Sequence, residues 1–309
     1  MSWSDNVPGK SDRVIGESRR VPRVLWVLIL FCLPLVGCQR FQARVEFNRG
    51  NAAFKQELYK EALQHFDKGL KLDPGATFAL RSVALTSMVL YRPGFDDPEN
   101  LKMADKSIDA FKRYLAAFEG KSDFDPKTEE YLLQLMLNSQ KYDEALAFLK
   151  ERRVKRPSDP QLVPAMVGVL VKAGRLPEAV EMTNQLSTNE LKAQHLHTIG
   201  VTAYENSSNA ELGFEGRKAM VDLGISALER SNSLVPEQSN VLTFWQLLLR
   251  EKAKSEMSYE AQAAIYEQAE AIYQRALVLI AKEREAAAAA AAKEAAAAPP
   301  ASAPPTKKP

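Results

Sequence analysis

The only two thiols of this 309-residue chain, Cys32 and Cys38, lie near the end of an apolar run from Val24 to Gly37. The run is about 14 residues long and follows a basic segment. A helix that spans a bilayer needs about 20 apolar residues, so this run is more typical of a secretory signal. A signal peptidase cuts beside small residues, and Gly37 directly precedes Cys38. The position of Cys38 therefore links its thiol to processing of the N-terminus.

The residues before the cut resemble the lipobox of bacterial lipoproteins, in which two aliphatic or small residues and then Gly or Ala precede a cysteine. Here the motif reads Leu35-Val36-Gly37-Cys38. The resemblance implies diacylglycerol on the Cys38 sulfur, cleavage before Cys38 and an acyl chain on the new amine. Cys32 follows the bulky Phe31 and would leave with the signal. The mature chain would then carry a covalent lipid, no other cofactor, no free thiol and no disulfide.

The same resemblance suggests where the chain resides. We expect a signal peptide at residues 1–37 and a lipidated N-terminus with a linker at residues 38–42. Gln39 stands where an aspartate would retain a lipoprotein at the inner membrane, so the outer membrane, on its periplasmic side, is favoured. The alternative is an uncleaved signal anchor that leaves the rest of the chain in the cytoplasm.

The remaining residues able to do chemistry do not form a catalytic or metal-binding set. His195 and His197 are two residues apart on an expected helix, so their side chains point about 200° apart and cannot clasp one metal. His65 precedes an expected core aromatic. The acidic turn at residues 96–99 lacks the spacing and central glycine of a calcium loop. We therefore expect no enzyme activity, no metal and no small-molecule substrate.

Charge argues against a nucleic-acid partner. The formal net charge of +2 comes from the residues before Cys38, and the rest of the chain is balanced. Nucleic-acid binding requires a net basic face that releases counterions.

The elements that must position a binding surface are helices. The stretch FNRGNAAFKQELYKEALQHFDKGLKLDPG, residues 47–75, resembles a tetratricopeptide repeat, a 34-residue pair of antiparallel helices. Its marker residues are Gly50, Tyr59, Ala62, Phe66 and Pro74. Small residues at Gly50 and Ala62 let two helix axes approach to about 8 Å. Aromatic residues fill the space beside that crossing, and Pro74 ends the second helix.

The pattern recurs along the chain. Ala145 and Ala179 are one period of 34 residues apart. Further markers are Pro157, Gly200, Gly224 and Pro236. Two turns, around residues 92–100 and 205–216, are expected to be stretched. We predict an all-α fold, a right-handed superhelical solenoid of antiparallel helix pairs over residues 43–282. The predicted repeats cover residues 43–76, 77–121, 126–159, 160–192 and 193–238, with a degenerate unit or cap at 239–282.

Residues 283–309 form an alanine- and proline-rich tail. Alanine has the highest helix propensity, so the last helix is expected to continue into the tail until Pro299 and Pro300 stop it. The last residues are expected to be disordered or to act as a spacer, with Lys307 and Lys308 touching acidic groups of the cell wall.

The first helices of the pairs are expected to line a concave groove. In the first two repeats the inward positions make an apolar patch edged by basic residues: Arg44, Phe47, Asn51, Phe54, Lys55, Phe78, Arg81, Leu85 and Met88. This composition suits a protein or peptide partner. Packing by the N-terminal linker or by a cap is the alternative. Phe47 stands where the carboxylate clamp of some tetratricopeptide repeats needs lysine, so binding of chaperone tails is not expected.

We therefore expect a lipid-anchored scaffold or adaptor of the bacterial cell envelope that holds a protein partner in this groove. Its architecture resembles that of type IV pilus pilotins, which help a secretin reach and assemble in the outer membrane. The alternative function is a structural spacer that contacts the cell wall through the Ala/Pro tail.

Overall fold

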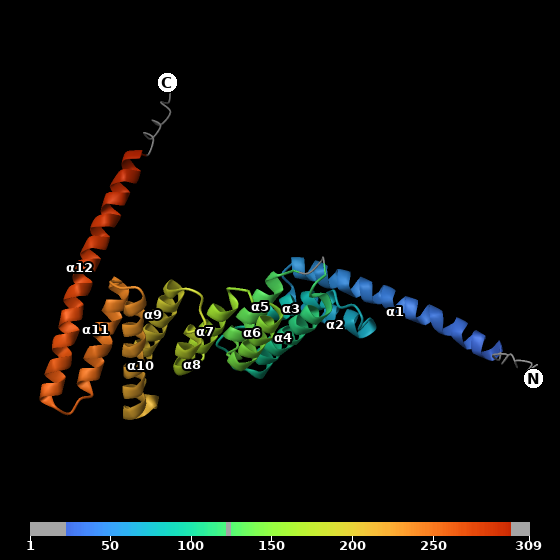
Figure 1. Ribbon diagram of the computed structural model, residues 1–309. Coiled ribbons are helices and arrows are strands. Elements are labelled where there is room, and N and C mark those ends of the chain that lie inside the picture. Colours follow the sequence, from blue (N-terminus) through green and yellow to red (C-terminus); the bar gives the residue numbers. More distant parts are fainter. Residues whose placement is uncertain (1–22, 122–124, 298–309) are drawn as a thin grey trace, which may run out of the picture. The chain divides into compact units, whose positions relative to one another are not determined.

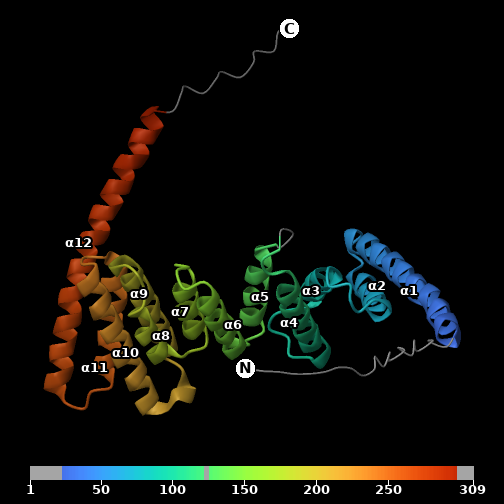
Figure 2. The ribbon, with the colours of Figure 1, turned by 45° about the vertical axis from the view of Figure 1, so that its right-hand side comes forward.

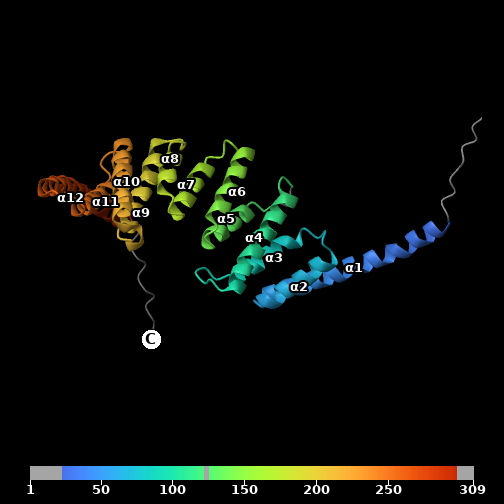
Figure 3. The same cartoon turned by 90° about the horizontal axis from the view of Figure 1, so that it is seen from below.

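A computed structural model describes residues 23–121 and 125–297 of the chain, with side chains from residue 38 to residue 293 outside the same gap. In these ranges the backbone forms twelve α-helices and one 3-10 helix, and no strand (Figure 1). Consecutive helices joined by short turns pack side by side, as in α1–α2, α3–α4, α9–α10 and α11–α12 (Figures 2 and 3). The predicted all-α class and antiparallel pairing are therefore confirmed.

Internal contacts divide the chain into two compact units, with the boundary between Leu132 and Leu133. This boundary falls inside a helix of the third predicted repeat. The first unit contains α1 (Arg23–Lys55), α2 (Tyr59–Leu72), α3 (Ala79–Leu90), α4 (Pro98–Phe118) and the start of α5 (Lys127–Asn138). The second unit contains the rest of α5, α6 (Tyr142–Lys155), α7 (Leu162–Lys172), α8 (Leu176–Thr183), α9 (Asn189–Asn206), η1 (Ala210–Leu212), α10 (Gly213–Leu234), α11 (Ser239–Lys254) and α12 (Tyr259–Ala297).

The packing of α1 against α2 follows from the marker residues. The buried residues of α2 are Ala62, Leu63, Phe66 and Gly69, which share one face of a helix. A Cβ atom built on Gly50 of α1 would lie 2.6 Å from Cε1 of Phe66, whose side chain is only 1% exposed. The ring of Phe66 therefore occupies the space that glycine leaves. Complete burial of such a ring stabilises a fold by about 1.5–3 kcal/mol.

The same arrangement occurs in the second unit. Gly200 of α9 lies beneath Leu228 of α10. A Cβ atom on Gly224 would lie 2.8 Å from that of Ala203 and 2.7 Å from Cδ1 of Leu248. The other small markers, Ala62, Ala145 and Ala179, are fully buried. The residues chosen from the sequence as helix-crossing positions are thus all buried.

The predicted prolines end their helices as expected. Pro74, Pro157 and Pro236 each stand two residues beyond a helix end, at Leu72, Lys155 and Leu234. All three prolines are exposed in the turns. A proline in a further helical turn would have no backbone N–H to donate, and its ring would clash with the carbonyl group of the preceding turn. Each helix therefore ends before its proline.

The two stretched turns are present at residues 91–97 and 207–212, against residues 56–58 between α1 and α2. Both are shorter than predicted, because most of the inserted residues are helical. α4 begins at Pro98, where the side chain of Asp97 accepts a hydrogen bond of 2.9 Å from the backbone N–H of Asn100. Such an N-cap followed by proline starts a helix efficiently. In the second insertion α9 continues to Asn206 and α10 already begins at Gly213. The insertions therefore lengthen the helices.

The N-terminal end of the helical array extends further than expected, and the C-terminal end follows the prediction. Residues 38–42, assigned as a linker, lie within α1, because the sequence there contains neither Gly nor Pro. α12 continues to Ala297, as predicted for the alanine-rich segment. Residues 284–293 are exposed. No helix in the described part of the chain is long and apolar enough to cross a membrane. Pro299, Pro300, Lys307 and Lys308 lie outside the described residues.

The last helix pair, α11–α12, contains small buried residues that the repeat markers did not include. Ala269 and Ala276 of α12 are 0% and 1% exposed and belong to a buried apolar cluster with Leu248 and Leu249 of α11. Ser239, the first residue of α11, donates a hydrogen bond of 2.9 Å to Glu283. Small residues thus allow close packing in this pair as well.

Candidate functional site

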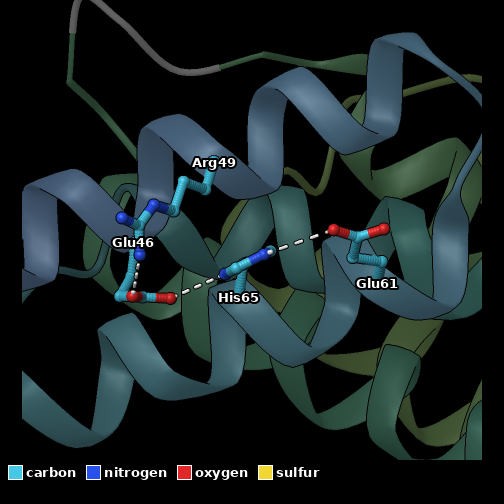
Figure 4. Close-up of polar contacts among 4 residues, drawn as sticks. All are labelled: Glu46, Arg49, Glu61 and His65. Atoms are coloured by element: carbon cyan, nitrogen blue, oxygen red, sulfur yellow. Dashed lines mark hydrogen bonds and ion pairs between the residues drawn. The ribbon is translucent and has the colours of Figure 1, made fainter.

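Charged side chains form a cluster of hydrogen bonds and ion pairs between α1 and α2. His65 lies half-buried and its Nδ1–H donates a hydrogen bond of 2.6 Å to Oε2 of Glu46 (Figure 4). Arg49 contacts the other oxygen of the same carboxylate at 3.0 Å. The hydrogen bond from His65 lowers the pKa of Glu46 below its ordinary value of 4.5. This cluster fastens α1 to α2.

The other two histidines lie on α9. Burial lowers the pKa of both His195 and His197 from 6.5. The ring of His197 packs edge-on against Phe244, with ring centroids 5.9 Å apart. Among the described residues no group of three or more His, Cys, Asp or Glu side chains is placed to hold a metal ion.

The nine residues predicted to line one groove have different environments. Arg44, Asn51 and Lys55 are exposed on α1, and Phe54, Leu85, Met88 and Arg81 are partly exposed. Arg81 forms an ion pair with Asp125, so its charge is already matched. The residues predicted to line one groove therefore lie mainly on two separate surfaces.

Phe47 is a core residue, which corrects its assignment to the open groove. Its side chain is 4% exposed and lies against Gly69 of α2. It also contacts the ring of Phe78 edge-on, with centroids 5.3 Å apart. Gly69 lacks a side chain, so the ring of Phe47 turns inward to fill that space. Phe78 itself remains 57% exposed.

The first surface is formed by α1 and α3, which are in contact. Asn51, Phe54 and Lys55 share one face of α1, and Leu85 and Met88 share one face of α3. We call these five residues the A-face. The ring of Phe54 packs edge-on against Tyr59, with centroids 5.3 Å apart, which holds it in place. The A-face combines exposed polar groups with partly exposed apolar side chains.

The second surface lies earlier along α1, at residues 40–47. An open hollow of about 560 Å³ lies there between α1 and the turn that joins α2 to α3. We call it the end hollow, and its lining residues are Arg40, Phe41, Arg44, Phe47, Asp73, Gly75, Ala76 and Phe78. Three residues of the predicted groove, Arg44, Phe47 and Phe78, belong to it.

Arg40 and Phe41 were not predicted as site residues, because residues 38–42 were expected to form a linker. In a continuous helix, Arg40, Arg44 and Phe47 lie on one face at spacings of four and three residues. That periodicity is visible in the sequence and would have identified the surface.

The predicted lipid-attachment residue is accessible. The Cys38 side chain is exposed and lies on α1, two residues before Arg40. Leu35, Val36 and Gly37 lie in the same helix, and their side chains are outside the described part of the chain.

Comparison with known proteins identifies one repeat directly. A family model described as "Tetratricopeptide repeat" matches residues 43–75. Hsp70-Hsp90 organizing protein 3 of Arabidopsis thaliana is 27% identical over 188 residues, which cover 52% of this chain. The chain spans only about a third of that relative's length, 33%.

Solved repeat proteins resemble the chain at low identity. A TPR repeats protein from Bacteroides fragilis is 14% identical, covering 67% of this chain and 97% of its own, with a TM-score of 0.39. YrrB, described as a TPR protein with an unusual peptide-binding site, is 18% identical over 64% of this chain and 89% of its own, with a TM-score of 0.35. These scores are too low to support an argument about what this chain binds. The family match shows that the first predicted repeat, with Gly50 and Phe66 at its crossing, is a tetratricopeptide repeat.

Proposed function

We propose that this chain is a membrane-tethered scaffold that holds a segment of another protein on its A-face. The observation that supports the proposal is the location of Asn51, Phe54 and Lys55 inside the matched tetratricopeptide repeat. Repeats of this kind serve as protein-interaction surfaces. Asn51 and Lys55 are exposed, and no described residue forms a hydrogen bond or ion pair with either side chain.

The A-face suits a partner segment that is apolar and carries an acidic residue. Phe54, Leu85 and Met88 offer apolar surface that a partner can cover, and burial of such surface drives association. Met88 adapts to irregular shapes because its side chain is unbranched. Lys55 would attract a carboxylate, and the amide of Asn51 can both donate and accept hydrogen bonds. Polar groups around an apolar centre are typical of protein interfaces.

The tether in this proposal is a lipid on Cys38, within the motif Leu35-Val36-Gly37-Cys38. Two or three acyl chains would anchor the protein stably, since stable anchoring takes about two membrane signals. The tether fixes the location at the periplasmic side of a bacterial envelope membrane, with the outer membrane favoured by Gln39. A component of an outer-membrane assembly, such as a pilus secretin, is the finer proposal for the partner. Mass spectrometry of the mature N-terminus tests the tether by itself.

Site-specific photo-crosslinking tests the A-face. A photoreactive residue at Asn51 is expected to give a protein adduct in intact cells, and Lys55→Glu is expected to weaken it. Gln64 provides a matched control, because its side chain is also exposed but lies on α2, outside the A-face. Adducts of equal yield from Asn51 and Gln64, or no adduct from Asn51, would contradict the proposal.

A structural spacer is the second candidate, and the length of α12 favours it. α12 contains 39 residues and α11 only 16, so α12 continues well beyond the Ser239–Glu283 contact. Removal of residues 285–309 separates the two functions. A spacer would lose its co-sedimentation with cell-wall polymer, whereas the A-face scaffold would keep its Asn51 adduct.

A further inference from the structure

We propose that the end hollow is a membrane-contact site that binds the headgroups of anionic phospholipids. This inference rests on the tether in the proposed function, and it assigns a separate role to a surface outside the A-face. The position of the hollow, its charge and its exposed aromatic rings each favour this ligand.

The position of the hollow is set by α1. This helix is continuous through Cys38, so each following residue lies about 1.5 Å further along its axis. Arg40, Phe41 and Arg44 then lie about 3, 4.5 and 9 Å beyond Cys38. The headgroup layer on each side of a bilayer is about 5–8 Å thick. A lipid on Cys38, or an anchor ending there, therefore places Arg40 and Phe41 at headgroup depth and Arg44 at the outer edge of the headgroup layer.

The turn between α2 and α3 completes the same end of the first unit. α2 runs antiparallel to α1 (Figure 2), so the turn after it lies beside the segment of α1 from Arg40 to Phe47. The contact of Phe47 with Gly69 and Phe78 fixes this arrangement. Phe78 is thereby held at the rim of the hollow near the tether, while the A-face lies further along α1.

The charge of the hollow matches an anionic surface. No described residue forms an ion pair or hydrogen bond with the side chain of Arg40 or Arg44, and Asp73 is the single acidic residue of the described lining. The lining therefore has a net positive charge. Guanidinium groups bind phosphate oxygens through paired N–H donors. Each basic residue near an anionic membrane strengthens attachment by about five-fold.

Two exposed aromatic rings fit the same partner. Phe41 is 70% exposed and Phe78 is 57% exposed, although both are large apolar side chains. Aromatic residues beside basic ones are typical of surfaces that lie in the membrane interface. An acidic peptide shares the charge preference, but the closeness of the hollow to Cys38 favours the membrane.

Contact at the end hollow would orient the scaffold. The lipid provides one attachment point, and the hollow adds a second on the same unit. Asn51 and Lys55 lie about 20 and 26 Å beyond Cys38 along the helix axis. With the end hollow on the headgroups, the A-face would be held away from the bilayer and open to a partner.

The test uses the full chain, purified from its own membranes and placed in lipid nanodiscs. Hydrogen exchange of the turn at residues 73–78 is compared between phosphatidylcholine discs and discs that also contain phosphatidylglycerol. We expect exchange to slow at least about five-fold in the anionic discs. The turn at residues 56–58, at the opposite end of the helices, should exchange equally in both.

Charge-reversal variants show which residues carry the response. Arg40→Glu with Arg44→Glu should abolish the slowing at residues 73–78. Lys60→Glu with Lys102→Glu changes the net charge equally at exposed positions outside the hollow and should retain it. Exchange that is independent of lipid charge, or slowing that persists in the Arg40/Arg44 variant, would overturn the inference.

Two further outcomes separate this inference from the proposed function. If the Arg40/Arg44 variant keeps the lipid response but loses the Asn51 adduct, the hollow belongs to the protein partner and the inference is overturned. If the chain does not co-purify with either type of disc, the tether fails and the inference fails with it. Stable co-purification without any effect of lipid charge overturns the inference alone.

Discussion

The α1–α2 and α9–α10 pairs use the same packing device with different large residues. In α1–α2 the ring of Phe66 covers Gly50, and in α9–α10 the side chain of Leu228 covers Gly200. The two pairs lie in different compact units, yet each large residue is at most 1% exposed. In both pairs a glycine allows the two helices to cross closely, whereas the residue that covers the glycine can be aromatic or aliphatic.

The two pairs differ in what surrounds this crossing. In α1–α2 the half-buried ion pair of Glu46 and His65 lies between the helices. In α9–α10 the residues around Leu228 join an apolar cluster that includes Leu242 and Ile272. The first pair is also shorter on its second helix, with 14 residues in α2 against 22 in α10.

Removal of the covering side chains should produce the largest effects. Phe66→Ala is expected to reduce the free energy of unfolding of the first unit by about 3–5 kcal/mol, because it leaves a cavity over Gly50. Leu228→Ala should cost the second unit about 2–5 kcal/mol. Hydrogen exchange measured at increasing denaturant concentration gives the free energy of unfolding of each unit separately. Equal destabilisation of both units by Phe66→Ala would contradict a local role for the ring.

Filling the glycine positions should have a smaller effect. Gly50→Ala and Gly200→Ala are each expected to cost about 1–3 kcal/mol through overpacking. In the first unit, Phe66→Leu should partly relieve the cost of Gly50→Ala, because the added Cβ then meets a smaller side chain. A double-mutant cycle in urea measures this coupling. Strict additivity of the two changes would show that the ring does not define the crossing.

The two helix-lengthening insertions should respond differently to loss of an asparagine. Asn100 is buried and bonds the backbone of Arg92 and Phe95, so Asn100→Ala should cost about 1–3 kcal/mol. Asn209 is exposed and accepts one bond from the N–H of Glu211, so Asn209→Ala should cost no more than about 1 kcal/mol. Thermal unfolding of both variants checks the order, and the reverse order would contradict it.

Acid should weaken the two pairs in different pH ranges, with the smallest effects of this series. The lowered pKa of Glu46 means that its stabilisation is complete above pH 4.5 and is lost as pH falls through the folded-state pKa. The pKa of His197 is lowered by burial, so its neutral ring stabilises fully above pH 6.5, and this is lost as pH falls further.

Variants at the two titrating residues isolate these contributions. His197→Phe should reduce the loss of unfolding temperature of the second unit between pH 7.5 and pH 5.5. Glu46→Gln should reduce the loss in the first unit below pH 4.5, the ordinary pKa of that carboxyl. Unchanged pH profiles in both variants would show that other groups control the response to acid.

The sequence alone predicted those parts of the fold that depend on local rules. Glycine and alanine at Gly50, Ala62 and Gly200 marked the crossings, and proline at Pro74 marked a helix end. The length of the first stretched turn was overestimated because Asp97 and Pro98, although a strong helix-start signal, were interpreted as part of that turn. The boundary inside α5 depends on the sum of packing contacts, which no single residue reveals.

The candidate site was less predictable than the fold. Repeat positions correctly located Asn51, Phe54 and Lys55 on one helix face, but they could not show that Phe47 turns inward over Gly69. The end hollow depends on residues from α1 and from the turn after α2, which only the folded chain brings together. Its basic side chains could have been found from helical spacing, whereas its volume could not.

Hydroxyl-radical footprinting of the complex captured through Asn51 tests the central claim most directly. The A-face account predicts that partner binding strongly reduces oxidation of Met88 and Phe54. Met257, which is 98% exposed in the second unit, and Phe95, which is 56% exposed after α3, should be oxidised as in the free chain. Unchanged oxidation of Met88 and Phe54 in the bound state would contradict the account.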